Sequence, residues 1–157
     1  MIWQSSSSAA TKNFGAAYAK RLLRRGRRTG AVVVGLIGDL GSGKTTFVQG
    51  FFRGVGARGR AVSPTFIIMR RATISRGDFR NLYHLDAYRL DASSEIEPLG
   101  LKTILAEPTN IVLVEWAERL RRVLPRRTEW IRFAHGQTPS SRTIRIERRL
   151  ENGRKKK

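Results

Sequence analysis

Residues Ala31-Val-Val-Val-Gly-Leu-Ile37 run directly into Gly38-Asp-Leu-Gly-Ser-Gly-Lys-Thr45, so an apolar segment is followed by a glycine-rich turn. The apolar segment contains three consecutive valines, which is typical of a strand buried on both faces of a sheet. After the turn, Phe47 and Phe51 keep a helical spacing, and a helix is predicted over residues 43–54. A strand, a glycine-rich loop and a helix in this order predict a P-loop, the motif that surrounds the phosphates of a nucleotide.

The chemistry of this loop follows from the charge of a nucleoside triphosphate. Backbone N–H groups and the positive end of the following helix both attract phosphate oxygens. Lys44 is expected to reach the β and γ phosphates, and the hydroxyl of Thr45 is expected to bind Mg²⁺. The alternative is a glycine-rich turn with a solvated lysine, and the buried strand before the loop argues against it. The predicted nucleotide-binding residues of the loop are Asp39, Leu40, Gly41, Ser42, Gly43, Lys44, Thr45 and Thr46.

Two acidic residues each stand at the carboxyl end of an apolar strand. In open α/β sheets, ligands bind beyond the carboxyl ends of the strands. Asp86 ends the predicted strand 81–86, and Glu115 follows the apolar run 111–114. Each is a candidate to bind the metal ion or to orient the attacking water, and the two roles stay open between them. The alternative for each is a helix cap or a surface acid. Together with Lys44 they form the predicted catalytic set.

Several other residues allow both a functional and an ordinary interpretation. Thr65, within a Ser-Pro-Thr-Phe turn, is a candidate switch that senses the γ-phosphate, although Ser-Pro pairs commonly mark plain turns. Trp116 either stacks on a base or fills the core. Arg89 either contacts phosphate or pairs with a nearby acid. His84 is interpreted as a packed histidine, and His135 has no evident partner.

The order of predicted elements defines the fold class. Strands alternate with helices early in the chain, and two adjacent late strands add an antiparallel part. We therefore expect a P-loop NTPase-like three-layer α/β domain over residues 1–150, with a mixed, partly antiparallel sheet flanked by helices and a basic, disordered tail at 151–157. Residues 5–8 are interpreted as a polar lead-in, and the spacing of Phe14, Ala17, Tyr18 and Leu22 places them on one face of the first helix. Helices are predicted at 9–25, 43–54, 93–106 and up to 123, and strands at 31–37, 67–69, 81–86, 111–114, 129–135 and 142–147.

Charge and composition limit the classes of function. The 157 residues carry a formal net charge of +19, and both halves of the chain contribute to the excess. A field of this sign attracts polyanions such as RNA, although a general preference for arginine gives the same composition. The absence of cysteine excludes disulfides, thiolate zinc sites and thiol nucleophiles. No apolar run approaches the roughly 20 residues of a membrane helix, so a cytoplasmic protein is expected, with a targeting helix at residues 12–28 as the alternative.

Taken in order, these motifs resemble the TsaE family of small bacterial ATPases, which act in the biosynthesis of tRNA threonylcarbamoyladenosine. Any single motif is common, but the resemblance preserves order and spacing over roughly residues 7–147. It also explains the predicted helix 9–25, because family members begin with a helix that leads into the loop strand. The segments that carry it are Gly38–Thr46, Ser63–Phe66, His84–Leu90, Leu99–Gly100, Val114–Glu118, Leu124–Pro125 and Arg142–Ile146.

The resemblance implies ATP and Mg²⁺ as cofactors and ATP hydrolysis as the activity. It also implies action with the TsaB–TsaD complex, in which TsaD carries out the carbamoyl transfer to tRNA and the ATPase resets the complex. Carried over by motif, Thr45 and Glu115 would serve the metal site. Thr65 would lie in a switch-like turn, Asp86 would be an essential acid, and Trp116 would lie near the nucleotide.

Other classes of protein share the P-loop. A small-molecule kinase needs an acceptor pocket and usually an arginine-rich lid, and no lid insertion is evident after Glu115. An RNA-associated binding module without turnover would use the basic charge, but no RNA-reading motif occurs. A GTPase is disfavoured because the chain lacks the Asn-Lys-x-Asp motif. Whether tRNA is met directly or through the partner complex stays open.

Overall fold

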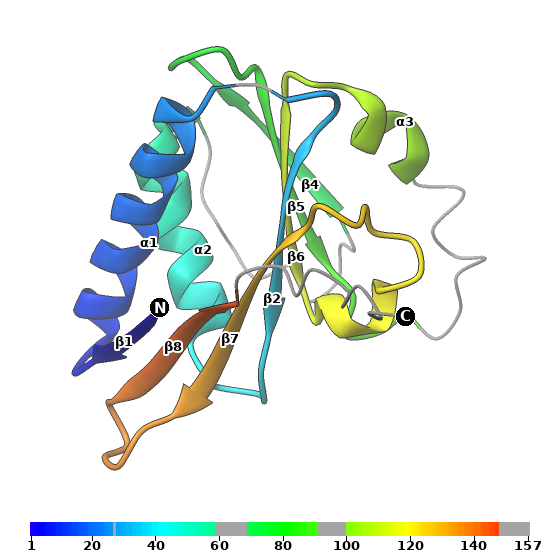
Figure 1. The fold of residues 1–157 in the computed structure, drawn as a ribbon. Helices are drawn as coiled ribbons and strands as arrows, with labels where there is room; N and C mark the ends of the chain where they lie inside the picture. Colours follow the sequence, from blue (N-terminus) through cyan, green and yellow to red (C-terminus); the bar gives the residue numbers. More distant parts are fainter. Residues whose placement is uncertain (27, 59–68, 91–99, 148–157) are drawn as a thin grey trace, which may run out of the picture.

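A mixed eight-stranded sheet forms the centre of the computed structural model, which describes residues 1–26, 28–58, 69–90 and 100–147 (Figure 1). The strands are β1 (Ile2–Ser5), β2 (Val32–Ile37), β3 (Ala57–Arg58), β4 (Met69–Ile74), β5 (Asn81–Asp86), β6 (Asn110–Glu115), β7 (Glu129–His135) and β8 (Arg142–Glu147). Their order is β1-β8-β7-β2-β6-β5-β4-β3. The central pairs from β7 through β2 and β6 to β5 are parallel, whereas both margins are antiparallel. The predicted mixed, partly antiparallel sheet is therefore confirmed.

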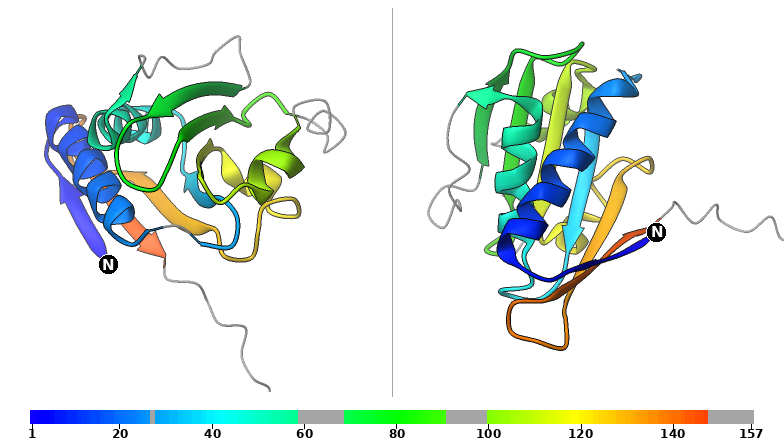
Figure 2. Two further views of the ribbon diagram at one scale, coloured as in Figure 1. Left: turned by 90° about the horizontal axis from the view of Figure 1, so that it is seen from above. Right: turned by 90° about the vertical axis from the view of Figure 1, so that its left-hand side faces the viewer.

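Helices cover both faces of this sheet, which gives the predicted three layers (Figures 1 and 2). The helices are α1 (Ser8–Arg24), α2 (Lys44–Val55), α3 (Leu101–Ala106) and the 3-10 helix η3 (Ala117–Leu120). Side by side, α1 and α2 pack on one face, and α3 and η3 lie on the other. Both cores are rich in aliphatic and aromatic side chains, and the P-loop strand β2 contributes to each of them.

The backbones of α1 and α2 touch each other. A Cβ atom at Gly15 would lie 2.3 Å from the backbone oxygen of Phe47, and one at Gly50 would lie 2.0 Å from that of Lys12. Only glycine lets two helices approach this closely. This contact sets which side of α1 faces inward, and it leaves Ala17 exposed.

Some margins of the sheet were not predicted from the sequence. The lead-in at residues 5–8 contains the end of β1, a four-residue strand that pairs with β8 at the other end of the chain. Strand β4 extends beyond the predicted 67–69 to Ile74, and in its second half the exposed Arg71 and Thr73 alternate with the buried Ala72 and Ile74. Three predicted segments lie wholly or partly outside the described part of the chain: residues 67–68 of a predicted strand, residues 93–99 of a predicted helix, and the predicted tail 151–157.

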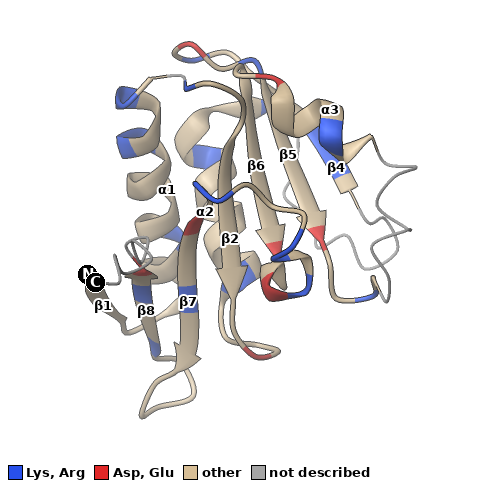
Figure 3. Cartoon of the chain, turned by 45° about the vertical axis from the view of Figure 1, so that its right-hand side comes forward, with Lys and Arg blue, Asp and Glu red and all other residues tan. Residues whose placement is uncertain are grey.

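Charge is spread over the layers (Figure 3). Basic positions occur on α1, α2, α3, β4, β7 and β8, while neither α1 nor α2 contains an acidic residue. Acidic residues instead close two neighbouring central strands, Asp86 on β5 and Glu115 on β6. These ends lie beside the N-terminus of α2, where the functional site is found.

Candidate functional site

Glycines with left-handed backbone angles shape the loop between β2 and α2. Gly38, Gly41 and Gly43 have φ angles of 147°, 71° and 102°. A Cβ atom at Gly38 would lie 2.3 Å from the backbone oxygen of Phe133, so a side chain is excluded there. Helix α2 begins at Lys44 with no side-chain cap and no acidic residue in its first turn. Its unpaired N–H groups and positive end therefore favour an anion such as phosphate.

Lys44 lies at the base of this loop and is only 4% exposed. Its Nζ donates to the backbone oxygens of Gly38 at 2.5 Å and Asp39 at 2.8 Å, and it sits 4.1 Å from the centroid of the Trp116 ring. Burial lowers the pKa of Lys44, and the surrounding carboxylates, Glu115 first among them, oppose that shift. The ammonium group is thus buried, and its hydrogen-bond acceptors are neutral backbone oxygens. An anionic phosphate oxygen would form a stronger hydrogen bond with it than these neutral oxygens do.

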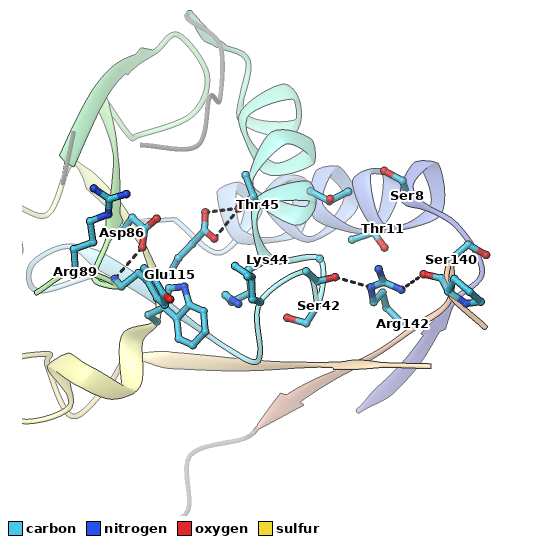
Figure 4. A pocket seen from close by; sticks show the side chains of 17 residues that line it. Ser8, Thr11, Ser42, Lys44, Thr45, Asp86, Arg89, Glu115, Ser140 and Arg142 are labelled. Atoms are coloured by element: carbon cyan, nitrogen blue, oxygen red, sulfur yellow. Dashed lines mark hydrogen bonds between the residues drawn. The ribbon is translucent and has the colours of Figure 1, made fainter. Parts of the chain in front are cut away.

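Glu115 is nearly fully buried at the end of β6 and contacts the first turn of α2. The Thr45 hydroxyl lies 2.8 Å from Oε2 and 3.1 Å from Oε1 of this carboxylate and donates to it (Figure 4). Hydroxyl and carboxylate oxygens are ligands that Mg²⁺ accepts. No group of three His, Cys, Asp or Glu residues in the described ranges could hold a metal ion. The pair fits a magnesium ion of the kind that takes one or two protein ligands and completes its shell with phosphate and water.

Asp86 ends β5 and lies opposite Glu115 in the parallel register. Its Oδ1 accepts a hydrogen bond from the backbone N–H of Tyr88 at 2.9 Å. Burial raises the pKa of Asp86, and the negative charge of Glu115 adds to the increase. The structure therefore separates the two acids: Glu115 contacts Thr45, whereas Asp86 is held by the turn that follows its own strand and lines the pocket.

Trp116 directly follows Glu115 and has a φ of 57°, the one positive value among the non-glycine residues that the structure describes. Such a backbone conformation costs energy and is found where the surroundings impose it. Its ring packs over Lys44 and lies 4.9 Å from the ring of Tyr88. The side chain thus belongs both to the pocket wall and to the margin of the core.

The loop opens into a pocket of about 690 Å³ with two ends (Figure 4). Asp86, Glu115 and Trp116 line one end. The first turn of α1 and the β7–β8 hairpin form the other end, where Nε of Arg142 donates to the backbone oxygen of Gly41 at 3.1 Å. Sequence analysis did not assign this second end, because its residues come from segments far apart in the chain and form no motif. The unassigned lining residues include Ser8, Thr11, Tyr88, Pro139, Ser140 and Arg142.

The remaining predicted residues fall into three groups. The loop residues Leu40, Gly41, Ser42, Gly43 and Thr46 line the pocket with Lys44 and Thr45, and Asp39 is exposed on the loop. Thr65 lies outside the described residues. His135, for which the sequence identified no partner, has its Nε2 3.2 Å from the backbone oxygen of Leu40. His84 is packed as expected, and its Nε2 lies 2.8 Å from Oε1 of Glu115.

Comparison with known proteins agrees with this geometry. The sequence model of the family described as "Threonylcarbamoyl adenosine biosynthesis protein TsaE" matches residues 5–144. The chain belongs to the TsaE family. In fold, the chain is similar to the crystal structure of YdiB from Bacillus subtilis, with a TM-score of 0.69 and 29% sequence identity, over 93% of this chain and 83% of that one.

Curated relatives carry the name "tRNA threonylcarbamoyladenosine biosynthesis protein TsaE". The protein from Haemophilus influenzae is 36% identical over 71% of this chain and 68% of its own length. The protein from Rickettsia bellii is 37% identical over 76% of both chains. The protein from Streptomyces coelicolor is 43% identical over 62% of this chain and 64% of its own. None of the described helices is long and apolar enough to cross a membrane.

Proposed function

We propose that this chain is the ATP-binding and ATP-hydrolysing component of tRNA threonylcarbamoyladenosine biosynthesis, and that it acts in the cytoplasm with the TsaB–TsaD complex and its tRNA. Membership of the TsaE family and the names of the relatives support the pathway. One observation carries the activity. A buried lysine in a glycine-rich loop stands beside a hydroxyl–carboxylate pair, Thr45 and Glu115, separated by 2.8 Å at the start of a helix.

Each residue at the phosphate end has a separate role in this proposal. Thr45 and Glu115 would hold Mg²⁺, which when bound neutralises charge on the β and γ phosphate oxygens. Lys44 leaves the backbone oxygens of Gly38 and Asp39 and stabilises the negative charge that develops as the phosphate bond breaks. The Tyr88 N–H holds Oδ1 of Asp86, which leaves Oδ2 to orient the attacking water and to hold its proton.

The nucleoside occupies the opposite end of the pocket in this proposal. Because Glu115 and Asp86 mark the metal and the terminal phosphate, the sugar and base extend past Thr46 toward Thr11 and Arg142. The guanidinium of Arg142 is held by the backbone oxygens of Gly41, Pro139 and Ser141 and offers a flat surface next to the loop. Replacing Arg142 with alanine should therefore weaken nucleotide binding and change turnover much less.

Mg²⁺-dependent hydrolysis of ATP tests the proposal, measured with the chain alone and with a TsaB–TsaD complex and tRNA. The expected result is hydrolysis that the complex stimulates and that Lys44→Ala abolishes together with tight triphosphate binding. Lys20→Ala on the exposed side of α1 is the matched control and should behave like the unmodified chain. Unchanged ATP affinity in Lys44→Ala would overturn the site assignment. Transfer of phosphate to a metabolite, or salt-dependent tRNA binding without hydrolysis, would replace the proposed activity with a kinase or a binding module.

A further inference from the structure

His84 is the one histidine of the described chain that lies in the core, and it is fully buried on β5. Its side chain is on the α2 face of the sheet, where the ring of Phe52 meets it edge-on at 6.1 Å. Nε2 lies 2.8 Å from Oε1 of Glu115. Nδ1 has no hydrogen-bond partner among the residues that the structure describes. Within the described chain, the hydrogen bond of this ring is therefore with Glu115, and the charge of Asp86 also acts on it.

Packing alone does not account for an imidazole at this position. A buried polar group without a partner destabilises the fold, and an apolar side chain of similar size would fill the same space without that cost. Because an ionised carboxylate only accepts hydrogen bonds, Nε2 carries the proton in this contact and donates it to Glu115. In the neutral form of the ring, Nδ1 is then an acceptor. The ring is oriented by its contact with the carboxylate, and the carboxylate is oriented by the ring.

Glu115 is held from two sides, and the two partners differ in what nucleotide binding does to them. Thr45 shares both carboxylate oxygens, but its hydroxyl is also the proposed Mg²⁺ ligand and must turn toward the ion. His84 is anchored in the sheet, one strand away from Glu115, and stays in place. We propose that His84 is a positioning residue, which fixes the Glu115 carboxylate toward Thr45 and thereby sets the affinity of the site for Mg²⁺. This inference rests on the function proposed above.

Two polar substitutions test this role. The amide nitrogen of glutamine occupies about the place of Nε2, whereas that of asparagine occupies the place of the unpartnered Nδ1. His84→Asn should raise the Mg²⁺ concentration required for half-maximal hydrolysis by about 10-fold to 100-fold, the effect typical of losing such a supporting contact. His84→Gln should restore it to near that of the unmodified chain. Binding of ATP in the presence of a chelator should be the same in all three proteins, because the phosphate loop is untouched.

A packing control separates a positioning role from a structural one. Leu82 lies on the same strand and the same face, is fully buried, and has no polar contact with Glu115. Leu82→Ala should lower the melting temperature without moving the Mg²⁺ midpoint. The Mg²⁺ dependence of binding of a fluorescent ATP analogue gives a readout that does not require turnover. Equal Mg²⁺ midpoints in His84→Asn and the unmodified chain would overturn the positioning role, and so would a shift in Leu82→Ala of the same size. An unmodified chain whose nucleotide binding ignores Mg²⁺ would instead overturn the proposed function, and the positioning role with it.

Discussion

The aromatic side chain of Phe47 connects the phosphate site to the rest of the fold, and its removal gives a sharp test of the packing argument. Phe47 lies on α2 three residues after Lys44 and is fully buried. Its ring meets those of Tyr18 at 5.7 Å and Phe133 at 5.5 Å in edge-to-face geometry, so one side chain joins α2 to α1 and to β7. Phe47→Ala removes both contacts and opens a cavity between the helices and the sheet.

The magnitude follows from burial and from the ring contacts. Phenylalanine-to-alanine changes in cores cost about 3–5 kcal/mol, and favourable aromatic pairs contribute about 0.5–1.5 kcal/mol each beyond buried area. With two edge-to-face partners, Phe47→Ala should cost about 5 kcal/mol, a large part of the about 5–15 kcal/mol that stabilises a typical domain. Phe79 is fully buried but has no ring partner in the described part of the chain, so Phe79→Ala should cost about 3 kcal/mol.

Urea unfolding at equilibrium measures both free energies on one scale. A loss below about 2 kcal/mol for Phe47→Ala would refute the reasoning, since it would mean that the cavity collapses or that the ring contacts contribute little. A loss in Phe79→Ala as large as that in Phe47→Ala would refute only the part assigned to the aromatic pairs. Phe47→Leu keeps most of the volume and should recover most of the stability.

The remaining predictions concern the helix contact, the acidic pair and the surface. Gly50→Ala should destabilise the protein by about 2 kcal/mol or more, because the new Cβ would lie 2.0 Å from the backbone oxygen of Lys12. This steric cost outweighs the better helix propensity of alanine. An unchanged free energy of unfolding in urea would show that the helices move apart easily. The raised pKa of Asp86 means that the folded state keeps a proton that the unfolded chain loses above pH 3.8, so this group removes stability as pH rises from 3.8 through the folded-state pKa. With a chelator present, Asp86→Asn should therefore become more stable relative to the unmodified chain as the pH rises from about 3.5 to neutral. A stability difference between the two proteins that stays constant over this range, which spans the ordinary pKa of 3.8, would contradict the raised pKa of Asp86. Arg132→Ala breaks an exposed ion pair with Glu147 and should change the free energy of unfolding by less than about 1 kcal/mol, whereas a larger loss in urea unfolding would indicate an unrecognised contact.

The local sequence pattern was sufficient to predict a strand or helix where the pattern lies entirely within that segment. The P-loop strand, the helix after it and the strand at 81–86 were predicted closely, because apolar periodicity and glycine placement are contained within each segment. The short strands β1 and β3 were not predicted, because each exists only through pairing with a distant or antiparallel partner. The exposure of Ala17 likewise depends on how α1 rotates against α2, which the spacing within one helix does not fix.

The candidate site also combines features that the local sequence predicts with features that depend on strand pairing. Lys44, Thr45 and Glu115 could be chosen from the sequence, because a loop motif and an acid at a strand end are local features. Their separation into a Thr45–Glu115 pair and an Asp86 held by Tyr88 required the register between β5 and β6. The contact between His84 and Glu115 likewise joins two strands, and the spacing of these residues along the chain does not predict it. What sequence reasoning lacked was therefore the side-by-side arrangement of segments rather than the chemistry of individual residues.

Burial and charge repulsion in the pocket bear on the kind of ligand that the proposed site would bind. Burial disfavours the charged form of Lys44 and of Asp86, while the two neighbouring carboxylates, Asp86 and Glu115, repel each other. A phosphate group gives the buried ammonium an anionic partner, and a divalent cation gives the carboxylates a positive one. Under the proposed function, each of these disfavoured charges would gain an opposite charge when nucleotide and metal ion bind together, and neither ligand alone would supply both. The proposed site would therefore favour the joint binding of a metal ion and a triphosphate over the binding of either one separately.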